Sequence, residues 1–149
     1  MTGKYPRLAV RGLLLHQDKL LLVNAWPGKK SDLWCAPGGG VDPGKSLPDN
    51  LIREFYEETG LDITVGAPAL VNEFHDPGSD FHQVDIYFHC DTEMPEIAED
   101  WVDPEGVVHS RRFVSRTELA GLRVKPDSLA EVAWGTGGIA YDPLEPIVR

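Results

Sequence analysis

The sequence has few cysteines, few basic residues and no long apolar run. Its 149 residues include two cysteines, Cys35 and Cys90, which form neither a disulfide framework nor the paired spacing of a zinc site. No apolar stretch reaches the roughly 18 residues that predict a membrane-spanning helix. The N-terminus also lacks the apolar core of a signal peptide. We therefore expect a cytoplasmic protein with reduced thiols and no membrane contact.

Acidic residues are in excess, with 24 Asp and Glu against 14 Lys and Arg, for a formal net charge of −10. Surfaces that bind the backbone of a nucleic-acid polymer are usually basic, so this balance argues against such a partner. Small phosphorylated ligands remain compatible with an acidic protein when metal ions screen the site. The chain has a usual single-domain length and shows no repeat or linker, which predicts one domain over residues 1–149.

A glycine-rich segment beginning at Gly38 admits two interpretations. Taken alone, residues 39–46 match the phosphate-loop pattern G-x-x-x-x-G-K-S, in which backbone amides and a lysine hold nucleotide phosphates. A phosphate loop follows a buried parallel strand in a chain of alternating strands and helices. The apolar runs 8–15 and 20–23 that precede this loop instead predict an antiparallel hairpin. A phosphate-loop NTPase is therefore the less favoured alternative.

Three glutamates stand close together after the glycine segment: Glu54, Glu57 and Glu58. At about 100° per residue, a helix places Glu54 and Glu58 on one face with Glu57 beside them. Like charges at this spacing destabilise a helix unless a cation offsets them. Magnesium takes oxygen ligands and shares them among carboxylates, waters and substrate phosphates. Arg53 stands four residues before Glu57 and is placed to orient it.

The loop and the acidic helix together resemble the Nudix box, whose pattern is G-x5-E-x7-R-E-U-x-E-E-x-G-U, where U is a bulky apolar residue. Eight of its nine defined positions match, namely Gly39, Arg53, Glu54, Phe55, Glu57, Glu58, Gly60 and Leu61. The departure is Lys45, where the pattern has glutamate. A lysine near a helix N-terminus opposes the helix dipole, and Asp42 or Asp49 is the candidate to replace the missing carboxylate.

The resemblance implies an α+β protein with a Nudix-type α/β/α sandwich, a mixed sheet and an acidic catalytic helix. It implies Mg²⁺-dependent hydrolysis of a diphosphate linkage in a nucleoside diphosphate linked to another moiety. Nucleoside triphosphates, nucleotide sugars, ADP-ribose and dinucleotides all stay open as substrates, and Mn²⁺ is the alternative metal. A Nudix-shaped module that binds nucleotides without hydrolysing them is the alternative from a different class.

The resemblance also assigns site residues. It makes Glu54, Glu57, Glu58 and the carbonyl of Gly39 metal ligands, and it makes Arg53 a partner of Glu57. It further implies that the acidic segment 91–106 supplies another catalytic carboxylate, for which Glu105 is the candidate because it comes just before a predicted strand. We expect most of the acidic side chains in that segment to be solvated.

Substrate-binding residues are expected next to the box. Trp26 could stack on a base and Lys29 could meet a phosphate, beside the backbone of Gly39 and Gly40. The rest of the chain predicts one bent strand or a strand pair over 61–74 and an alternating strand over 82–89 with one mainly apolar face. A strand over 107–115 and short helices over 117–122 and 127–134 follow, with Ser115 or Thr117 and Asp127 as N-caps. Residues 135–149 are expected to form an irregular tail that packs locally or against a second subunit in a homodimer.

Overall fold

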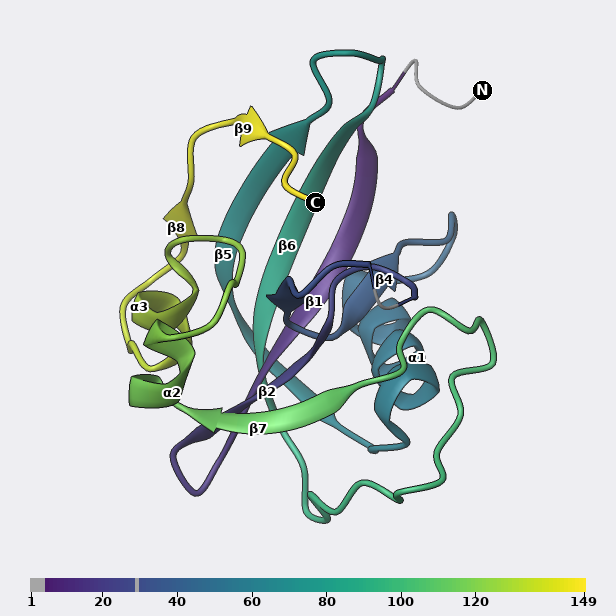
Figure 1. Ribbon diagram of the computed structural model, residues 1–149, viewed down its shortest axis with the longest axis vertical. Helices are drawn as coiled ribbons and strands as arrows, with labels where there is room; N and C mark the ends of the chain where they lie inside the picture. The colour runs from purple at the N-terminus through teal and green to yellow at the C-terminus, as the bar shows by residue number, and fades with distance from the viewer. Residues whose placement is uncertain (1–4, 29) are drawn as a thin grey trace.

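The computed structural model describes residues 5–28 and 30–149, which form a mixed sheet with helices on both faces (Figure 1). The central strands run in the order β3-β2-β1-β6-β5-β8, while β4 pairs with β1, β7 with β2 and β9 with β5. β1 is parallel to β6 and antiparallel to β2. The strands are β1 (Arg7–His16), β2 (Lys19–Asn24), β3 (Trp34–Cys35), β4 (Gly38–Gly40), β5 (Thr64–His75), β6 (His82–Asp91), β7 (Arg111–Ser115), β8 (Ala140–Tyr141) and β9 (Glu145–Pro146).

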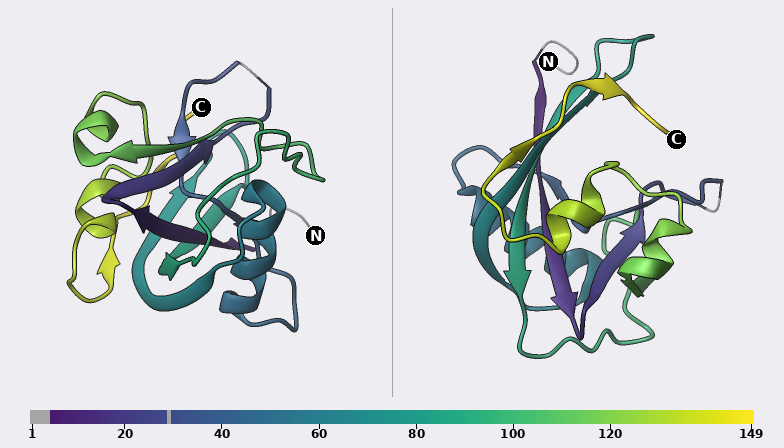
Figure 2. Two further views of the ribbon diagram at one scale, coloured as in Figure 1. Left: turned by 90° about the horizontal axis from the view of Figure 1, so that it is seen from below. Right: turned by 90° about the vertical axis from the view of Figure 1, so that its left-hand side faces the viewer.

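Two apolar cores lie on opposite faces of the sheet. On one face, Phe55 of α1 (Leu47–Thr59) packs in a cluster with Val10 and Leu14 of β1. On the other, Leu13 packs with side chains of α2 (Arg116–Ala120) and α3 (Leu129–Ala133). Successive residues of a strand point to opposite faces, so β1 serves both cores. Figure 2 shows α1 on one side of the sheet and the two short helices on the other. The predicted α+β sandwich with a mixed sheet is confirmed.

Local signals explain where α1 begins and ends. The Ser46 side chain accepts a hydrogen bond from the backbone N–H of Asp49, which caps the helix. Gly60 ends it in the left-handed region at φ 75°, where glycine has no steric penalty, and its N–H bonds to the Tyr56 carbonyl. Phe55 is fully buried in the first core. The buried face fixes the rotation of the helix, and with it the direction of the glutamates.

The predicted hairpin is confirmed, since β1 and β2 pair antiparallel with Leu15 opposite Leu20. The predicted strand over 61–74 is the single strand β5, with irregular register around Pro68. The strand expected over 107–115 begins only at Arg111. The backbone N–H groups of the residues before it donate to the side chains of Asp103 and Asn24 instead of to carbonyls of a neighbouring strand.

The short helices differ in detail from the prediction. α2 covers 116–120. Its N-cap is Ser115, one of the two expected residues, which forms a complete capping box with Glu118. α3 covers 129–133 and follows Ser128, so the expected Asp127 cap is wrong. The tail is only partly irregular, because β8 and β9 run parallel to β5 along its edge. An edge strand has unpaired backbone N–H and C=O groups, and those of β5 bond to β8 and β9.

The predicted strand over 82–89 is β6, and its more polar face is the more deeply buried one. Gln83 and Asp85 are 2% and 3% exposed, whereas Val84 and Ile86 are only partly buried. Alternation predicts which residues share a face, but both faces of this sheet are covered. The buried polar side chains are paired with arginines of β1. Cys35 and Cys90 are free thiols, and no helix among the described residues is long and apolar enough to cross a membrane.

Candidate active site

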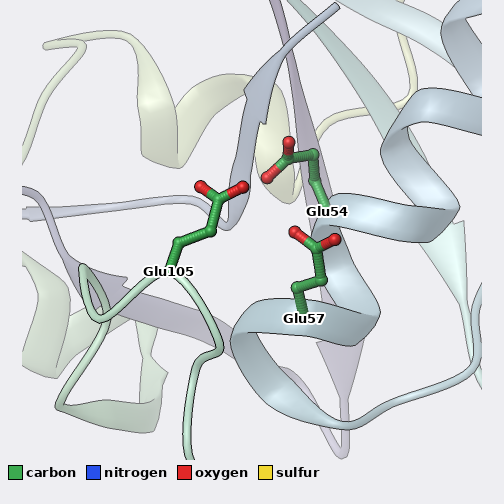
Figure 3. Close-up of side chains that lie close together, drawn as sticks. All are labelled: Glu54, Glu57 and Glu105. Atoms are coloured by element: carbon green, nitrogen blue, oxygen red, sulfur yellow. The ribbon is translucent and has the colours of Figure 1, made fainter. Parts of the chain in front are cut away.

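Three carboxylates converge between α1 and the loop that joins β6 to β7. Figure 3 shows Glu54 and Glu57 projecting from the helix toward Glu105 of the loop. One oxygen of each residue lies within 4.8 Å of the others. Glu54 is buried, Glu57 is half-buried and Glu105 is exposed. Three anions at this separation repel one another, so the arrangement calls for a cation.

The three carboxylates fit a hard divalent ion such as Mg²⁺ or Mn²⁺. The Oε2 atom of Glu57 is buried and has no hydrogen-bond partner among the described residues, and leaving a buried acceptor unpaired is costly. Burial raises the pKa of Glu54, with Arg53 opposing the shift and Glu105 adding to it. Carboxylate oxygens are the ligands that these ions prefer. Glu54, Glu57 and Glu105 are therefore the residues that would hold a metal.

Arg53 holds the carboxylates of the helix in place. Its Nη1 atom lies 3.2 Å from Oε1 of Glu54 and 3.5 Å from Oε1 of Glu57. Its Nη2 atom pairs with Asp42 at 3.1 Å. Asp42, one of the two candidates to replace a carboxylate at position 45, thus contacts the site through Arg53, while Asp49 lies in the first turn of α1. Lys45 is exposed.

Glu58 lies beside the three converging carboxylates and not among them. Its Oε1 atom accepts a hydrogen bond from the backbone N–H of Gly38 at 3.1 Å, and the residue is 8% exposed. Burial raises the pKa of Glu58 to about 8, although Arg11 and the Gly38 N–H act in the opposite direction. The side chain therefore ties β4 to α1. Glu58 also lines the cleft beside Glu54 and Glu105, and its predicted role as a metal ligand stays a prediction.

The glycines of β4 leave space for the helix carboxylates. A Cβ atom at Gly39 would lie 2.4 Å from Oε2 of Glu54, too close for any real contact. Gly39 and Gly40 line a cleft of about 560 Å³ together with Arg53, Glu54, Glu58 and Glu105. β4 is antiparallel to β1, and the Ser46 hydroxyl caps α1. This glycine segment therefore does not follow a parallel strand, as a phosphate loop would.

The loop that carries Glu105 is held in shape by the buried side chain of Asp103. Asp103 is 4% exposed, and its carboxylate accepts hydrogen bonds from the N–H groups of Glu105, Val107 and Val108 at 2.8 to 3.1 Å. Asp103 is thus an exception to the expectation that most acidic side chains of this segment are solvated. The turn-forming run Asp-Pro-Glu-Gly is the sequence signal for this role, since aspartate side chains bond backbone groups two residues on.

Two further side chains join this loop to the helix. Arg111 donates to the carbonyls of Glu58, Trp101 and Val108. The Trp101 indole donates to the carbonyl of Glu57 at 2.9 Å. These bonds occupy carbonyls of the last helical turn that have no partner inside the helix. They fix the distance between α1 and the loop.

A second cavity, of about 350 Å³, adjoins the cleft, and the two share Arg7, Arg11, Ala25 and Cys35. Trp26 lies on the second cavity and not on the cleft, and Lys29 falls outside the described residues. Arg7 and Arg11 were not among the site residues predicted from the sequence. Both interrupt an apolar strand four residues apart, a spacing that places two charges on one face of the sheet.

Comparison with known proteins finds a family match and several similar structures. The model of the NUDIX domain family matches residues 5–134. Diphosphoinositol polyphosphate phosphohydrolase 3-alpha from Homo sapiens is 30% identical over 98 residues, covering 66% of this chain and 56% of the relative. A UDP-X diphosphatase structure aligns with a TM-score of 0.72 and 22% identity, over 93% of this chain and 68% of that one. An ADP-ribose pyrophosphatase structure from Streptococcus suis aligns at 0.66 and 21% identity, over 93% and 100%.

The chain belongs to the NUDIX domain family, because the family model covers most of its length. The two structural neighbours share its fold, which confirms the Nudix-type sandwich. The chain spans about half the length of the curated relatives that it matches.

Proposed function

We propose that this protein hydrolyses a diphosphate linkage in a nucleoside diphosphate derivative, with Mg²⁺ or Mn²⁺ as cofactor. The observation that carries the proposal is the convergence of Glu54, Glu57 and Glu105, in which Glu57 has a buried carboxylate oxygen with no partner in the part of the chain that the structure describes. Names of similar proteins support it, since they include an ADP-ribose pyrophosphatase and a UDP-X diphosphatase. The names of both proteins denote cleavage of a diphosphate bond.

Some side chains of the site would bind the cofactor, and others position the backbone and the carboxylates around it. A bound divalent ion neutralises diphosphate charge and lowers the pKa of a coordinated water. Glu54, Glu57 and Glu105 would hold that ion, and Arg53 keeps the two helix carboxylates in one orientation. Glu58 holds β4 against the helix through Gly38. Groups already oriented in the resting protein need no rearrangement during the reaction, which is where much of the rate gain arises.

A nucleotide-binding module without hydrolysis is the alternative. The retained set of Arg53, Glu54, Glu57 and Glu58 favours the enzyme. Metal ligation by Glu58 and by the Gly39 carbonyl, one domain over 1–149, a cytoplasmic location, a homodimer and the absence of a nucleic-acid partner remain predictions.

A turnover assay tests the proposal. The purified chain is incubated with Mg²⁺ and a panel of nucleoside triphosphates, nucleotide sugars, ADP-ribose and dinucleotides, and then with excess EDTA. We expect at least one substrate to be cleaved, and EDTA to stop its cleavage. Glu54→Gln and Glu58→Gln should each lower turnover roughly 100-fold or more while the protein stays folded.

The matched control is Glu131→Gln, which changes an exposed carboxylate on α3, away from the cleft. Its turnover should equal that of the unaltered protein. Tight nucleotide binding without any cleavage in excess Mg²⁺ would support the binding module instead.

A further inference from the structure

Asn24, the last residue of β2, is a buried side chain at the edge of the cleft, with 7% of its surface exposed. An asparagine amide offers two N–H donors and an oxygen that accepts two bonds. Its Nδ2 atom donates to the carbonyls of Trp26 at 2.8 Å and Val107 at 2.9 Å. Its Oδ1 atom accepts from the N–H groups of His109 at 2.9 Å and Ser110 at 3.0 Å. Backbone groups therefore use the whole bonding capacity of this amide.

The four backbone groups belong to two segments that lie far apart in the sequence. Trp26 is in the connection between β2 and β3, whereas Val107, His109 and Ser110 end the loop between β6 and β7. Asn24 and Val107 both line the cleft. The backbone adds to the attachment, because the N–H of Asn24 donates to the Ser110 carbonyl at 3.3 Å. One side chain thus joins both segments to the end of β2.

Asp103 gives the turn around Glu105 its shape but not its place. The carboxylate of Asp103 accepts bonds from the N–H groups of Glu105, Val107 and Val108, which all belong to the same loop. The N–H of Gly106 also bonds to the Asp103 carbonyl at 2.9 Å. Bonds within a turn move with the turn, so they do not set its distance from the helix carboxylates.

Contacts with the rest of the molecule set that distance. Before the turn, the Trp101 indole donates to the Glu57 carbonyl on α1 at 2.9 Å. After the turn, Asn24 holds Val107, which is two residues beyond Glu105. A segment attached at one end can pivot about that end, and a second attachment removes the motion. The Glu105 side chain is itself exposed, so the position of its backbone decides where the carboxylate can reach.

We propose that Asn24 is a positioning residue that places Glu105 beside Glu54 and Glu57. It acts through the Val107 carbonyl and not as a ligand, because its amide is already used by backbone groups. Residues that orient metal ligands without touching the metal have a large effect on affinity. A loop that is already held also loses less conformational entropy when a ligand binds. The inference rests on the proposed function in that Glu105 is one of the residues that would hold the ion.

A double-mutant cycle on metal binding tests the inference, with Asn24→Ala and Glu105→Gln made singly and together. Electron paramagnetic resonance measures the affinity for Mn²⁺. We expect each single change to lower that affinity by at least about tenfold. Because Asn24 acts through Glu105, adding Asn24→Ala to Glu105→Gln should lower the affinity by no more than about a further twofold. A residue that only stabilises the fold would lower the affinity equally in both backgrounds.

Hydrogen exchange followed by mass spectrometry gives a second readout that needs no metal. In EDTA, Asn24→Ala should speed exchange at His109 and Ser110, whose N–H groups lose their acceptor. The matched control is Asn72→Ala, which removes another buried asparagine, bonded to Asp142 at 3.1 Å and not part of the cleft lining. It should leave Mn²⁺ affinity and exchange at 109–110 unchanged. If Asn24→Ala does not fold, Asn24→Ser replaces it with the same expected losses, since one hydroxyl donor cannot serve two carbonyls.

Several results would overturn the inference. They are unchanged Mn²⁺ affinity in the Asn24 or Glu105 variants, an equal fall in affinity with and without Glu105→Gln, and unchanged exchange at 109–110. Absence of Mn²⁺ binding by the unaltered protein would overturn both this inference and the proposed function. The expected cycle in a protein that cleaves no member of the substrate panel would leave the inference standing and defeat the proposed function. Metal-dependent hydrolysis with an affinity that does not depend on Asn24 would do the reverse.

Discussion

At the residue scale, the carboxylates of the site differ in what surrounds each of them. Glu54 is paired with Arg53, Glu105 is open to solvent, and Glu57 has a buried oxygen without a partner among the described residues. An unpaired buried acceptor has the most to gain from a bound cation. Glu57 is therefore the residue whose change should report metal binding most directly.

The change Glu57→Gln should lower Mn²⁺ affinity by at least about tenfold, because even indirect partners of metal ligands cost that much when they are replaced. Titration of free Mn²⁺ by electron paramagnetic resonance measures the affinity. Glu131→Gln is the control and should bind as the unaltered protein does. Equal affinity in both variants would show that Glu57 is not a ligand.

Gly39→Ala should weaken metal binding without unfolding the protein. The added Cβ would meet the Glu54 carboxylate at 2.4 Å, and the end of a side chain can move where backbone cannot. The displaced carboxylate would lose its position beside Glu57 and Glu105. The same Mn²⁺ titration, with a thermal melt, checks both parts. The control is Gly137→Ala, since a Cβ there meets no atom within 4 Å. Identical metal binding in both variants would be evidence against a close contact between Gly39 and the Glu54 carboxylate.

Some of these roles could be predicted from sequence and others could not. The spacing of Glu54 and Glu57 places them on adjoining stripes of any helix, so local geometry was enough. Glu105 was a weaker prediction, because its distance from α1 depends on a loop folded by Asp103, Arg111 and Trp101. The burial of Gln83 and Asp85 was missed, since alternation does not say which face of a strand is covered.

At the element scale, the loop between β6 and β7 owes its shape to one buried side chain. Asp103→Ala would leave three backbone N–H groups without their acceptor, each loss costing about 1–3 kcal/mol if the group stays buried. We expect faster hydrogen exchange in residues 103–108 and weaker Mn²⁺ binding. Asp100→Ala, at an exposed position of the same loop, is the control. Unchanged exchange at 103–108 would mean that other contacts hold the loop.

The helix that carries the glutamates is held by its apolar face. Phe55 is fully buried in the core beneath α1, so Phe55→Ala should lower the free energy of unfolding by about 3–5 kcal/mol. Urea unfolding followed by circular dichroism measures it. Ile52→Ala is the control on the same helix, where the side chain is 38% exposed and a smaller loss is expected. Similar losses in both variants would contradict the packing described for this face.

Long, capped elements were predicted better than short ones. α1 has an N-cap serine, an ending glycine and a periodic apolar face that agree with one another. α3 has only five residues and no side-chain cap, so its limits depend on packing that no local pattern encodes. β8 and β9 form because the edge of β5 is available to pair with them.

At the scale of the whole molecule, two cores hold the sheet between α1 and the short helices, and the cleft opens between that sheet, α1 and the loop. A ligand that binds only the folded state stabilises it, by about 2.7 kcal/mol at a concentration one hundred times its Kd. Mg²⁺ should therefore raise the Tm relative to NaCl of equal ionic strength, and EDTA should reverse the rise. In Glu57→Gln the rise should be much smaller. An equal rise in NaCl would mean that Mg²⁺ only screens the net charge of −10.

Identification of the products formed in oxygen-18 water tests the central claim most directly. The purified chain is incubated with Mg²⁺ and the substrate panel, and the products are weighed by mass spectrometry. Diphosphate hydrolysis predicts a nucleoside monophosphate and a second phosphorylated product, with one oxygen-18 atom in one of the two and none without Mg²⁺. Release of labelled inorganic phosphate and a nucleoside diphosphate from triphosphates alone would contradict the account, because it would place the cleavage at a terminal phosphate.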